Sequence, residues 1–237
     1  MKISIPEPES FAQLCSYMEG IKNIIFDFGN VLFDLDLSAT RRKMKSLLGD
    51  KFDAVYDKIR QYKLFELYET GGISTEEFLE TIKTASNNQV SESELRDAWN
   101  SIFIEFPMHR LEMLQGLRQE YNVFLLSNIN AMHEQWIAEY VLREHGIHDY
   151  ESRFFDGVYF SHLVRLRKPN AAIYEYLIAD AEIKPNESVF FDDLPENIET
   201  ARQLGIHSFV HSPGTEIREH VNEILISMRN VPIRNAK

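Results

Sequence analysis

The chain has very little cysteine and no long apolar run. Cys15 is the only cysteine among its 237 residues, so an internal disulfide framework is excluded and a reducing compartment is favoured. No apolar stretch approaches the roughly 20 residues that a membrane-spanning helix needs. Residues 1–9 are polar, carry two prolines and lack the apolar centre of a secretory signal. We therefore expect a cytoplasmic protein with no membrane partner.

Basic charge is also scarce. The chain has 25 Lys and Arg residues against 37 Asp and Glu residues, which gives a formal net charge of −12. Proteins that bind nucleic acid normally carry a basic stripe, so a nucleic-acid partner is not expected. A small anionic ligand remains compatible with this charge, because local charge at a site matters more than the sum. The sequence makes no prediction of oligomeric state.

What the chain does contain is a series of short apolar segments. The first, residues 24–32, is hydrophobic on both faces and predicts a buried parallel strand. Four further segments are β-prone, and helical periodicity fills most of the intervals between them. The further strands are predicted at 122–127, 157–161, 188–192 and 207–210, and the helices at 107–120, 131–144, 170–181, 195–204 and 216–228. Alternating strands and helices predict a doubly wound parallel sheet.

The interval between the first two strands is different. Residues 38–106 contain no convincing strand, and two capping-box patterns begin at Ser74 and Ser91. A crossover of this length far exceeds the usual strand–helix–strand connection. We therefore predict an α/β fold, with a Rossmann-like parallel sheet core formed by residues 1–37 and 107–237. Residues 38–106 would form an inserted helical cap, the alternative being a long crossover without a functional role.

Polar side chains follow three of the predicted strands. Asp27 ends the first, Ser127-Asn128 the second and Asp192-Asp193 the fourth, while Lys168 precedes a helix. Ligands of open α/β sheets bind outside the carboxyl ends of the strands, where these residues would meet. Each residue also has a structural alternative, as a helix N-cap for the first groups or as a solvated lysine. Their joint occurrence favours a site.

These segments together resemble the four motifs of the haloacid dehalogenase superfamily. The matching stretches, in chain order, are Phe26-Asp27-Phe28-Gly29-Asn30-Val31-Leu32, Leu126-Ser127-Asn128, Lys168-Pro169 and Phe191-Asp192-Asp193-Leu194-Pro195-Glu196-Asn197-Ile198. The insertion after the first motif stands where this superfamily places its type-1 cap. The Gly-Asn-Val form of the first motif is similar to the bacterial α-D-glucose-1-phosphate phosphatases. The resemblance implies a hydrolase acting on a small phosphate monoester, with a sugar phosphate favoured.

The resemblance implies a role for each matched residue. Asp27 would be the nucleophile that forms an aspartyl-phosphate, and also a ligand of Mg²⁺, a cation that prefers oxygen donors. Asp193 would be the second carboxylate on the metal, and Asp192 a further or more distant contact. The backbone carbonyl of Gly29 would be another metal ligand.

The remaining implied residues concern the substrate. Ser127 and the Asn128 amide would donate hydrogen bonds to phosphoryl oxygens, and Lys168 would bring positive charge to Asp27 and the phosphate. Glu69 lies in a segment, Tyr68 to Ser74, that resembles the substrate loop of the cap. Arg167 is a further candidate contact.

Gly29 departs from the pattern of the phosphatases. They usually carry a second Asp there, which protonates the leaving alcohol and contributes ~10²–10⁴-fold in rate. A phosphatase with another proton donor, a 2-haloacid dehalogenase-like hydrolase and a catalytically weak phosphate-ligand-binding protein all remain open. The candidate donors are Asp34, Asp36, Glu66, Glu69 and bulk water.

Overall fold

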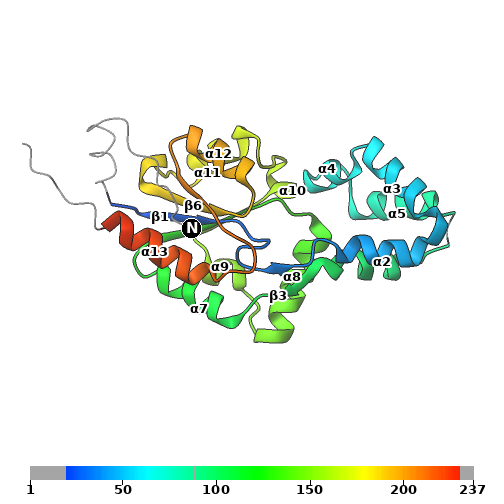
Figure 1. The fold of residues 1–237 in the computed structure, drawn as a ribbon, viewed down its shortest axis with the longest axis horizontal. Helices are drawn as coiled ribbons and strands as arrows, with labels where there is room; N and C mark the ends of the chain where they lie inside the picture. Colours follow the sequence, from blue (N-terminus) through cyan, green and yellow to red (C-terminus); the bar gives the residue numbers. More distant parts are fainter. Residues whose placement is uncertain (1–19, 88, 230–237) are drawn as a thin grey trace, which may run out of the picture.

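The computed structural model describes residues 20–87 and 89–229, so Cys15 and residues 1–9 lie outside the described part (Figure 1). A five-stranded sheet with the order β5-β4-β1-β6-β7 forms the centre, and each neighbouring pair is parallel. The predicted parallel sheet is therefore confirmed. The strands are β1 (Asn23–Phe26), β4 (Asn122–Ser127), β5 (Gly157–Phe160), β6 (Ser188–Asp192) and β7 (His207–Val210).

Helices cover both faces of this sheet (Figure 1). Alternate side chains of β1 point to opposite faces, so Ile24 and Phe26 join one apolar cluster while Ile25 joins another. On the first face lie α7 (Met108–Leu117), α8 (Ala131–His145), α9 (Tyr150–Phe154) and α13 (Ile217–Arg229). On the second lie α11 (Ala171–Asp180) and α12 (Pro195–Gln203). The short elements α10 (Ser161–Val164) and η3 (Pro185–Glu187) precede α11 and β6.

The first apolar segment is only partly a strand. The strand was predicted to run out at Asp27, and β1 does end at Phe26. Beyond it the N–H groups of Leu32 and Phe33 both donate to the carbonyl of Phe28 at 2.9 Å. Asn30 has a φ of 57° within this turn. The run is apolar because the turn itself packs into the core, with Leu32 and Phe33 fully buried.

A second, two-stranded sheet joins the core to the inserted segment. It pairs β2 (Asp34–Leu35) antiparallel with β3 (Phe103–Glu105). The expectation of no strand within 38–106 is therefore wrong at its last residues. The pairing partner of β3 is almost 70 positions away in the chain, and three partly exposed residues carry no strand periodicity of their own.

The inserted segment is mainly helical and has its own apolar cluster; it is called the cap below. Its apolar cluster includes Leu48, Phe52 and Phe78, separate from the two clusters of the sheet. Both predicted capping boxes are confirmed, since Ser74 and Ser91 each exchange hydrogen bonds with the glutamate three residues later. The elements are α2 (Ala39–Leu48), η1 (Gly49–Lys51), α3 (Phe52–Gln61), α4 (Leu64–Glu69), α5 (Thr75–Ala85), α6 (Glu92–Trp99) and η2 (Asn100–Ile102).

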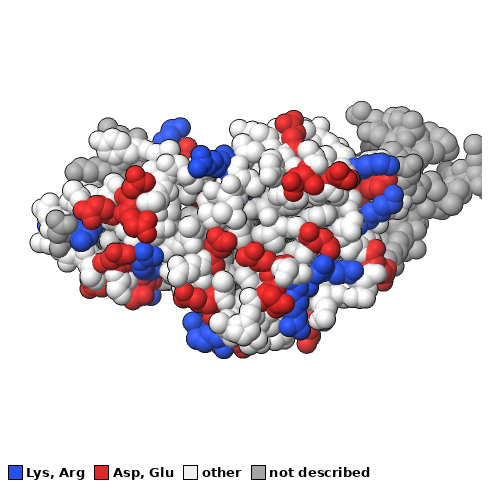
Figure 2. All heavy atoms as spheres, turned by 180° about the vertical axis from the view of Figure 1, so that it is seen from behind, with Lys and Arg blue, Asp and Glu red and all other residues white. Residues whose placement is uncertain are grey.

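Two further features are the distribution of charge on the surface and the apolar character of the helices. On the face shown in Figure 2, the Lys and Arg side chains of the described residues are interspersed with Asp and Glu and do not gather into one basic patch. Among residues 20–87 and 89–229, no helix combines the length and the apolar character needed to cross a membrane.

Candidate active site

Three charged side chains meet where β1 and β6 end. The Lys168 Nζ atom donates hydrogen bonds to Asp27 Oδ1 and Asp192 Oδ2, both at 2.6 Å. All three residues are buried, with 1% exposure for Lys168 and 0% for Asp192. β1 and β6 are neighbours in register, with Phe26 opposite Phe191, so each strand delivers its aspartate to the same edge of the sheet. The topology alone therefore brings two distant parts of the chain together.

Burial and neighbouring charge act in opposite directions in this cluster. Burial raises the pKa of Asp27 to about 7, and the nearby Asp192 adds to that rise, while the Lys168 ammonium opposes it. Burial alone would lower the pKa of Lys168, but the two carboxylates outweigh it and raise that pKa. Lys168 therefore stays charged and holds a buried positive charge against Asp27.

Asp192 is held from several sides. Its Oδ1 atom accepts hydrogen bonds from the Leu194 N–H at 2.9 Å and from the Asn197 side-chain amide at 2.8 Å. The same amide reaches Oδ2 at 3.0 Å, the oxygen that also binds Lys168. Each oxygen of Asp192 thus already has two donors. The carboxylate fixes the position of the Lys168 ammonium, which is the role that its contacts support.

Asp193 has a more open environment. Its Oδ2 atom accepts a hydrogen bond from the Asn30 side chain at 3.0 Å. Burial raises the pKa of Asp193, and the bond from Asn30 opposes this. Carboxylate oxygens of Asp27, Asp192 and Asp193 lie within 4.8 Å of one another. The three carboxylates offer oxygen atoms as metal ligands, and Asp193 accepts few hydrogen bonds from the protein. Such a cluster fits a hard divalent cation such as Mg²⁺.

Ser127 and Asn128 end β4 beside this cluster. Ser127 is 3% exposed, and within the described part of the chain its hydroxyl makes no hydrogen bond. Asn128 is already engaged, because its side-chain oxygen accepts from the Lys168 N–H at 2.8 Å and its amide donates to the Lys168 carbonyl at 2.9 Å. Asn128 therefore positions Lys168, a role that the motif comparison did not predict. A contact between Asn128 and a phosphoryl group stays a prediction.

The space beside Gly29 is filled by a leucine. A Cβ atom at position 29 would lie 2.6 Å from Cδ1 of Leu35. Gly29 forms an isolated bridge with Phe33, which brings the start of β2 back over the turn. A side chain at position 29 would thus require the end of the Leu35 side chain, in the linker to the cap, to shift.

The cap meets the core next to this cluster. Glu69, the last residue of α4, forms an ion pair at 3.0 Å with Arg167, the neighbour of Lys168. The Glu69 carbonyl accepts a hydrogen bond of 2.6 Å from the Ser161 hydroxyl, at the end of β5. Gly71, with a φ of 62°, packs against the backbone of His162. Glu69 is thus placed at the junction of cap and site.

The four candidate proton donors differ in their surroundings. Asp34 forms an ion pair with Arg110 at 2.7 Å, and Asp36 forms one with Arg42 at 2.6 Å. Hydrogen bonds from Arg42 hold the pKa of Asp36 well below its usual range. Burial raises the pKa of Glu69, although the Arg167 charge opposes it. Glu66 is half exposed and lies 3.8 Å from Arg167.

Comparison with known proteins places the chain in a family. A family model described as haloacid dehalogenase-like hydrolase matches residues 24–211, which is most of the chain. The chain belongs to the haloacid dehalogenase-like hydrolases. The superfamily resemblance and the hydrolase class expected from the four motifs are therefore confirmed.

Several members of the family are similar to this chain over most of its length. The D-ribitol-5-phosphate phosphatase of Bacteroides thetaiotaomicron is 32% identical over 210 residues, covering 87% of this chain and 100% of that protein. A crystal structure of a HAD family enzyme from the same organism has a TM-score of 0.79 at 28% identity, covering 86% of this chain and 99% of that one. Its wild-type complex with magnesium and inorganic phosphate has a TM-score of 0.76 at 30% identity, covering 83% and 97%.

The sequence analysis named the charged residues of this cluster, but it did not predict the neighbouring residues that contact them. Asp27, Asp192, Asp193, Lys168 and Ser127 were all named from strand ends and motifs. The contacts of Asn30, Asn197 and Leu35 were not predicted. Asn30 and Asn197 lie inside the motifs and have side chains that can donate, which is the signal that could have found them. Leu35 carries no such signal, because its role depends on a turn.

Proposed function

We propose that the chain hydrolyses a small phosphate monoester, in the first place a sugar phosphate, through an aspartyl-phosphate on Asp27. The observation that carries the proposal is the Lys168 ammonium, shared between Asp27 and Asp192 in a buried cluster next to Asp193. The D-ribitol-5-phosphate phosphatase among the relatives supports a sugar or sugar-alcohol ester. The first-motif likeness adds α-D-glucose 1-phosphate to the substrates to be tested.

The chemistry assigns Asp27 the covalent step. A carboxylate oxygen of Asp27 attacks phosphorus, the bond from phosphorus to the ester oxygen breaks, and the leaving oxygen takes a proton from one of the candidate donors or from water. The oxygen of a water molecule then attacks phosphorus, the bond from phosphorus to Asp27 breaks, and inorganic phosphate leaves. The water gives up a proton that restores the donor, and Asp27 is again a carboxylate. Lys168 would offset the negative charge of the phosphoryl oxygens, and the free hydroxyl of Ser127 would donate to one of them.

Mg²⁺ fits the carboxylate cluster. Asp27, Asp193 and the backbone carbonyl of Gly29 would hold it, while Asp192 acts through Lys168 or as a further contact. When bound, the cation would neutralise charge on the phosphoryl oxygens. Structures of the Bacteroides enzyme with magnesium support this assignment.

The cap would select the organic part of the ester. We propose residues 38–106 as the cap and 1–37 with 107–237 as the catalytic core, with Glu69 at their junction contacting substrate. Closure of the cap would exclude water from the reacting group. A cytoplasmic location is part of the same proposal and rests on the single cysteine, which favours a reducing compartment.

An assay of phosphate release tests the proposal directly. A panel of sugar phosphates, including D-ribitol 5-phosphate and α-D-glucose 1-phosphate, is measured with and without Mg²⁺. We expect metal-dependent release that Asp27→Asn abolishes and that the exposed cap substitution Asp53→Asn leaves unchanged.

The same preparation separates the alternatives. Metal-independent halide release from 2-chloro acids would identify a dehalogenase instead. Binding of phosphate esters without any turnover would identify the phosphate-ligand-binding protein. Either result would contradict the proposed reaction.

A further inference from the structure

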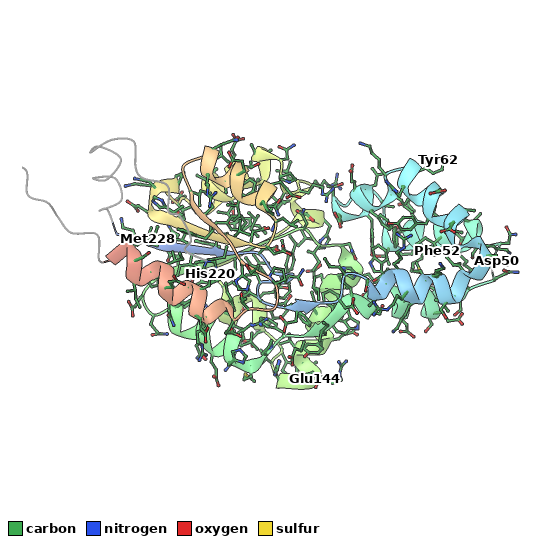
Figure 3. The ribbon with its side chains drawn as sticks, viewed as in Figure 1. Asp50, Phe52, Tyr62, Glu144, His220 and Met228 are labelled. Atoms are coloured by element: carbon green, nitrogen blue, oxygen red, sulfur yellow. The ribbon has the colours of Figure 1, made fainter. Side chains whose placement is uncertain are left out.

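A cavity lies inside the cap, on the side that meets the core. Its volume is about 270 Å³, close to the lower end of the ~300–1,000 Å³ typical of small-molecule pockets. Helices α2, α3 and α4 of the cap line it, and His133 of the core helix α8 closes one part. Figure 3 labels Phe52 in the cap, where its side chain is one of the walls. The cavity is thus large enough for a single ring.

The walls of this cavity are mostly apolar and aromatic. Phe52, Phe65, Trp99 and Met44 contribute to them. Burial lowers the pKa of His133 to about 4, so this ring is uncharged at neutral pH and adds another aromatic surface. An uncharged aromatic lining favours an apolar guest.

The polar residues of the lining are already engaged. The Thr40 hydroxyl donates to the Trp99 carbonyl at 3.0 Å. The Arg41 guanidinium lies over the rings of Phe52 and Tyr56, at 5.6 and 5.1 Å from their centroids. These two polar groups are therefore not available to bind a polar guest unless they give up their present contacts. A fully hydroxylated guest would leave many of its own hydroxyl groups without partners here.

Glu69 connects the cavity to the proposed phosphate site. It lines the cavity, and its Oε2 atom binds Arg167, the residue next to Lys168. Lys168 in turn binds Asp27. Glu69 is thus the lining residue that contacts the segment carrying Lys168, and it is where the proposal places the polar middle portion of a substrate whose phosphate lies at Asp27.

We infer that the cap cavity binds an apolar or aromatic substituent of the substrate, so that the preferred class is a sugar phosphate carrying such a group. The inference rests on the proposed phosphatase function and deepens it. The inference predicts a different kcat/KM for two esters that share the same phosphate and the same sugar when one of them bears an added ring. Because the ring is remote from the ester bond, it changes binding and leaves the bond that breaks the same.

Glucose 6-phosphate and phenyl β-D-glucoside 6-phosphate are the matched probes. We expect kcat/KM to be higher for the phenyl compound by about tenfold or more, mainly through KM, because burial of an aromatic ring is strongly favourable. Leu37 lines the cavity mouth and is 66% exposed, so Leu37→Trp should obstruct the cavity without disturbing a packed core. In this variant the ratio between the two substrates should fall to about one.

Ile104 supplies the matched control. It lies in β3, the other linker between core and cap, is 56% exposed and does not line the cavity. Ile104→Trp should keep the preference for the phenyl compound. Equal kcat/KM for the two substrates in the unaltered protein would overturn the inference, as would a preference that survives in Leu37→Trp.

Binding measurements keep the inference separate from the proposed reaction. Calorimetry on Asp27→Asn with Mg²⁺ compares the affinities of the two probes without turnover. Tighter binding of the phenyl compound, lost when Leu37→Trp is added, supports the cavity even if no phosphate is released by the unaltered protein. Phosphate release with equal affinities would retain the phosphatase and reject the cavity.

Discussion

Gly71 of the cap lies directly against the carbonyl oxygen of His162 in the core, and a Cβ atom at position 71 would overlap that oxygen. The neighbouring Glu69 carbonyl is bound by Ser161. The cap therefore approaches the core backbone to backbone, at a point where no larger residue fits.

Gly71→Ala should disturb this approach. The φ of 62° disfavours alanine and the overlap with His162 adds to that cost, so we expect a loss of about 2 kcal/mol in the free energy of unfolding and a raised KM. Gly146→Ala is the control, since Gly146 has a φ of 68° and nothing within 4 Å of its Cβ position. It should lose about 1 kcal/mol and keep its KM. Equal behaviour of both variants in denaturant titration and kinetics would contradict the account.

Lys168→Met should destabilise the fold as well as remove activity. It leaves Asp27 and Asp192 buried without their cation, and breaking such a pair costs about 3 kcal/mol. Chemical denaturation at pH 7 measures the loss, and Mg²⁺ should restore part of it. Lys22→Met removes an exposed partner of Glu187 and should change stability little. A similar small change for Lys168→Met would show that the buried charges are compensated elsewhere.

Glu69→Gln tests the missing proton donor. Among the four candidates Glu69 has the pKa raised by burial, so it is the one we expect to protonate a poor leaving group. The kcat for an alkyl phosphate should fall by about 10²-fold, with little change for 4-nitrophenyl phosphate, whose leaving group needs no acid. Asp34→Asn, Asp36→Asn and Glu66→Gln serve as comparisons. Unchanged rates in all four variants would leave bulk water as the donor.

Leu35 should determine whether an acid can be installed at position 29. Gly29→Asp alone would have to push the end of the Leu35 side chain aside, so we expect a smaller gain in rate than when that side chain is removed. Gly29→Asp combined with Leu35→Ala frees the space and should raise kcat for alkyl phosphates. Steady-state kinetics of the two variants, with Leu35→Ala as control, checks this. Equal gains in the single and the double variant would show that Leu35 yields freely.

Acid should destabilise the protein through His133. Burial lowers its pKa to about 4, against about 6.5 in the unfolded chain, so the unfolded state takes up the proton first. Its contribution is present above pH ~6.5 and is lost as the pH falls towards ~4, amounting to about 2 kcal/mol between pH 7.5 and 5. His133→Phe should reduce the pH dependence of the unfolding free energy, and exposed His148→Phe should not. Parallel pH curves for both variants would refute the assignment.

The sheet could be predicted because its signals are local. Each central strand is a short apolar run, and the polar residue that ends it is adjacent in sequence, as with Asp27 and Asp192. Parallel pairing then brings these ends together without further information. The capping boxes at Ser74 and Ser91 are equally local, and both were found.

The remaining features depend on contacts between distant segments. The β2–β3 pairing joins Asp34 to Glu105, and neither short stretch carries a sequence pattern that identifies its pairing partner. Asn128 looks like a ligand for phosphate in sequence, but the fold places the Lys168 backbone against its side chain. The position of Leu35 against Gly29 follows from a turn whose φ angles no periodicity reveals. In each case the feature depends on a contact between segments that are distant in sequence.

The β2–β3 ribbon has a consequence for how the cap is attached. The two chain crossings run side by side and are hydrogen-bonded to each other, so the inserted segment starts and finishes at nearly the same place. Such an insertion could be exchanged for another of different length, or for a short turn, without stretching the sheet beneath it. Core and cap are in this sense separable units of the fold, and under the proposed function the selectivity of one would be transferable onto the chemistry of the other.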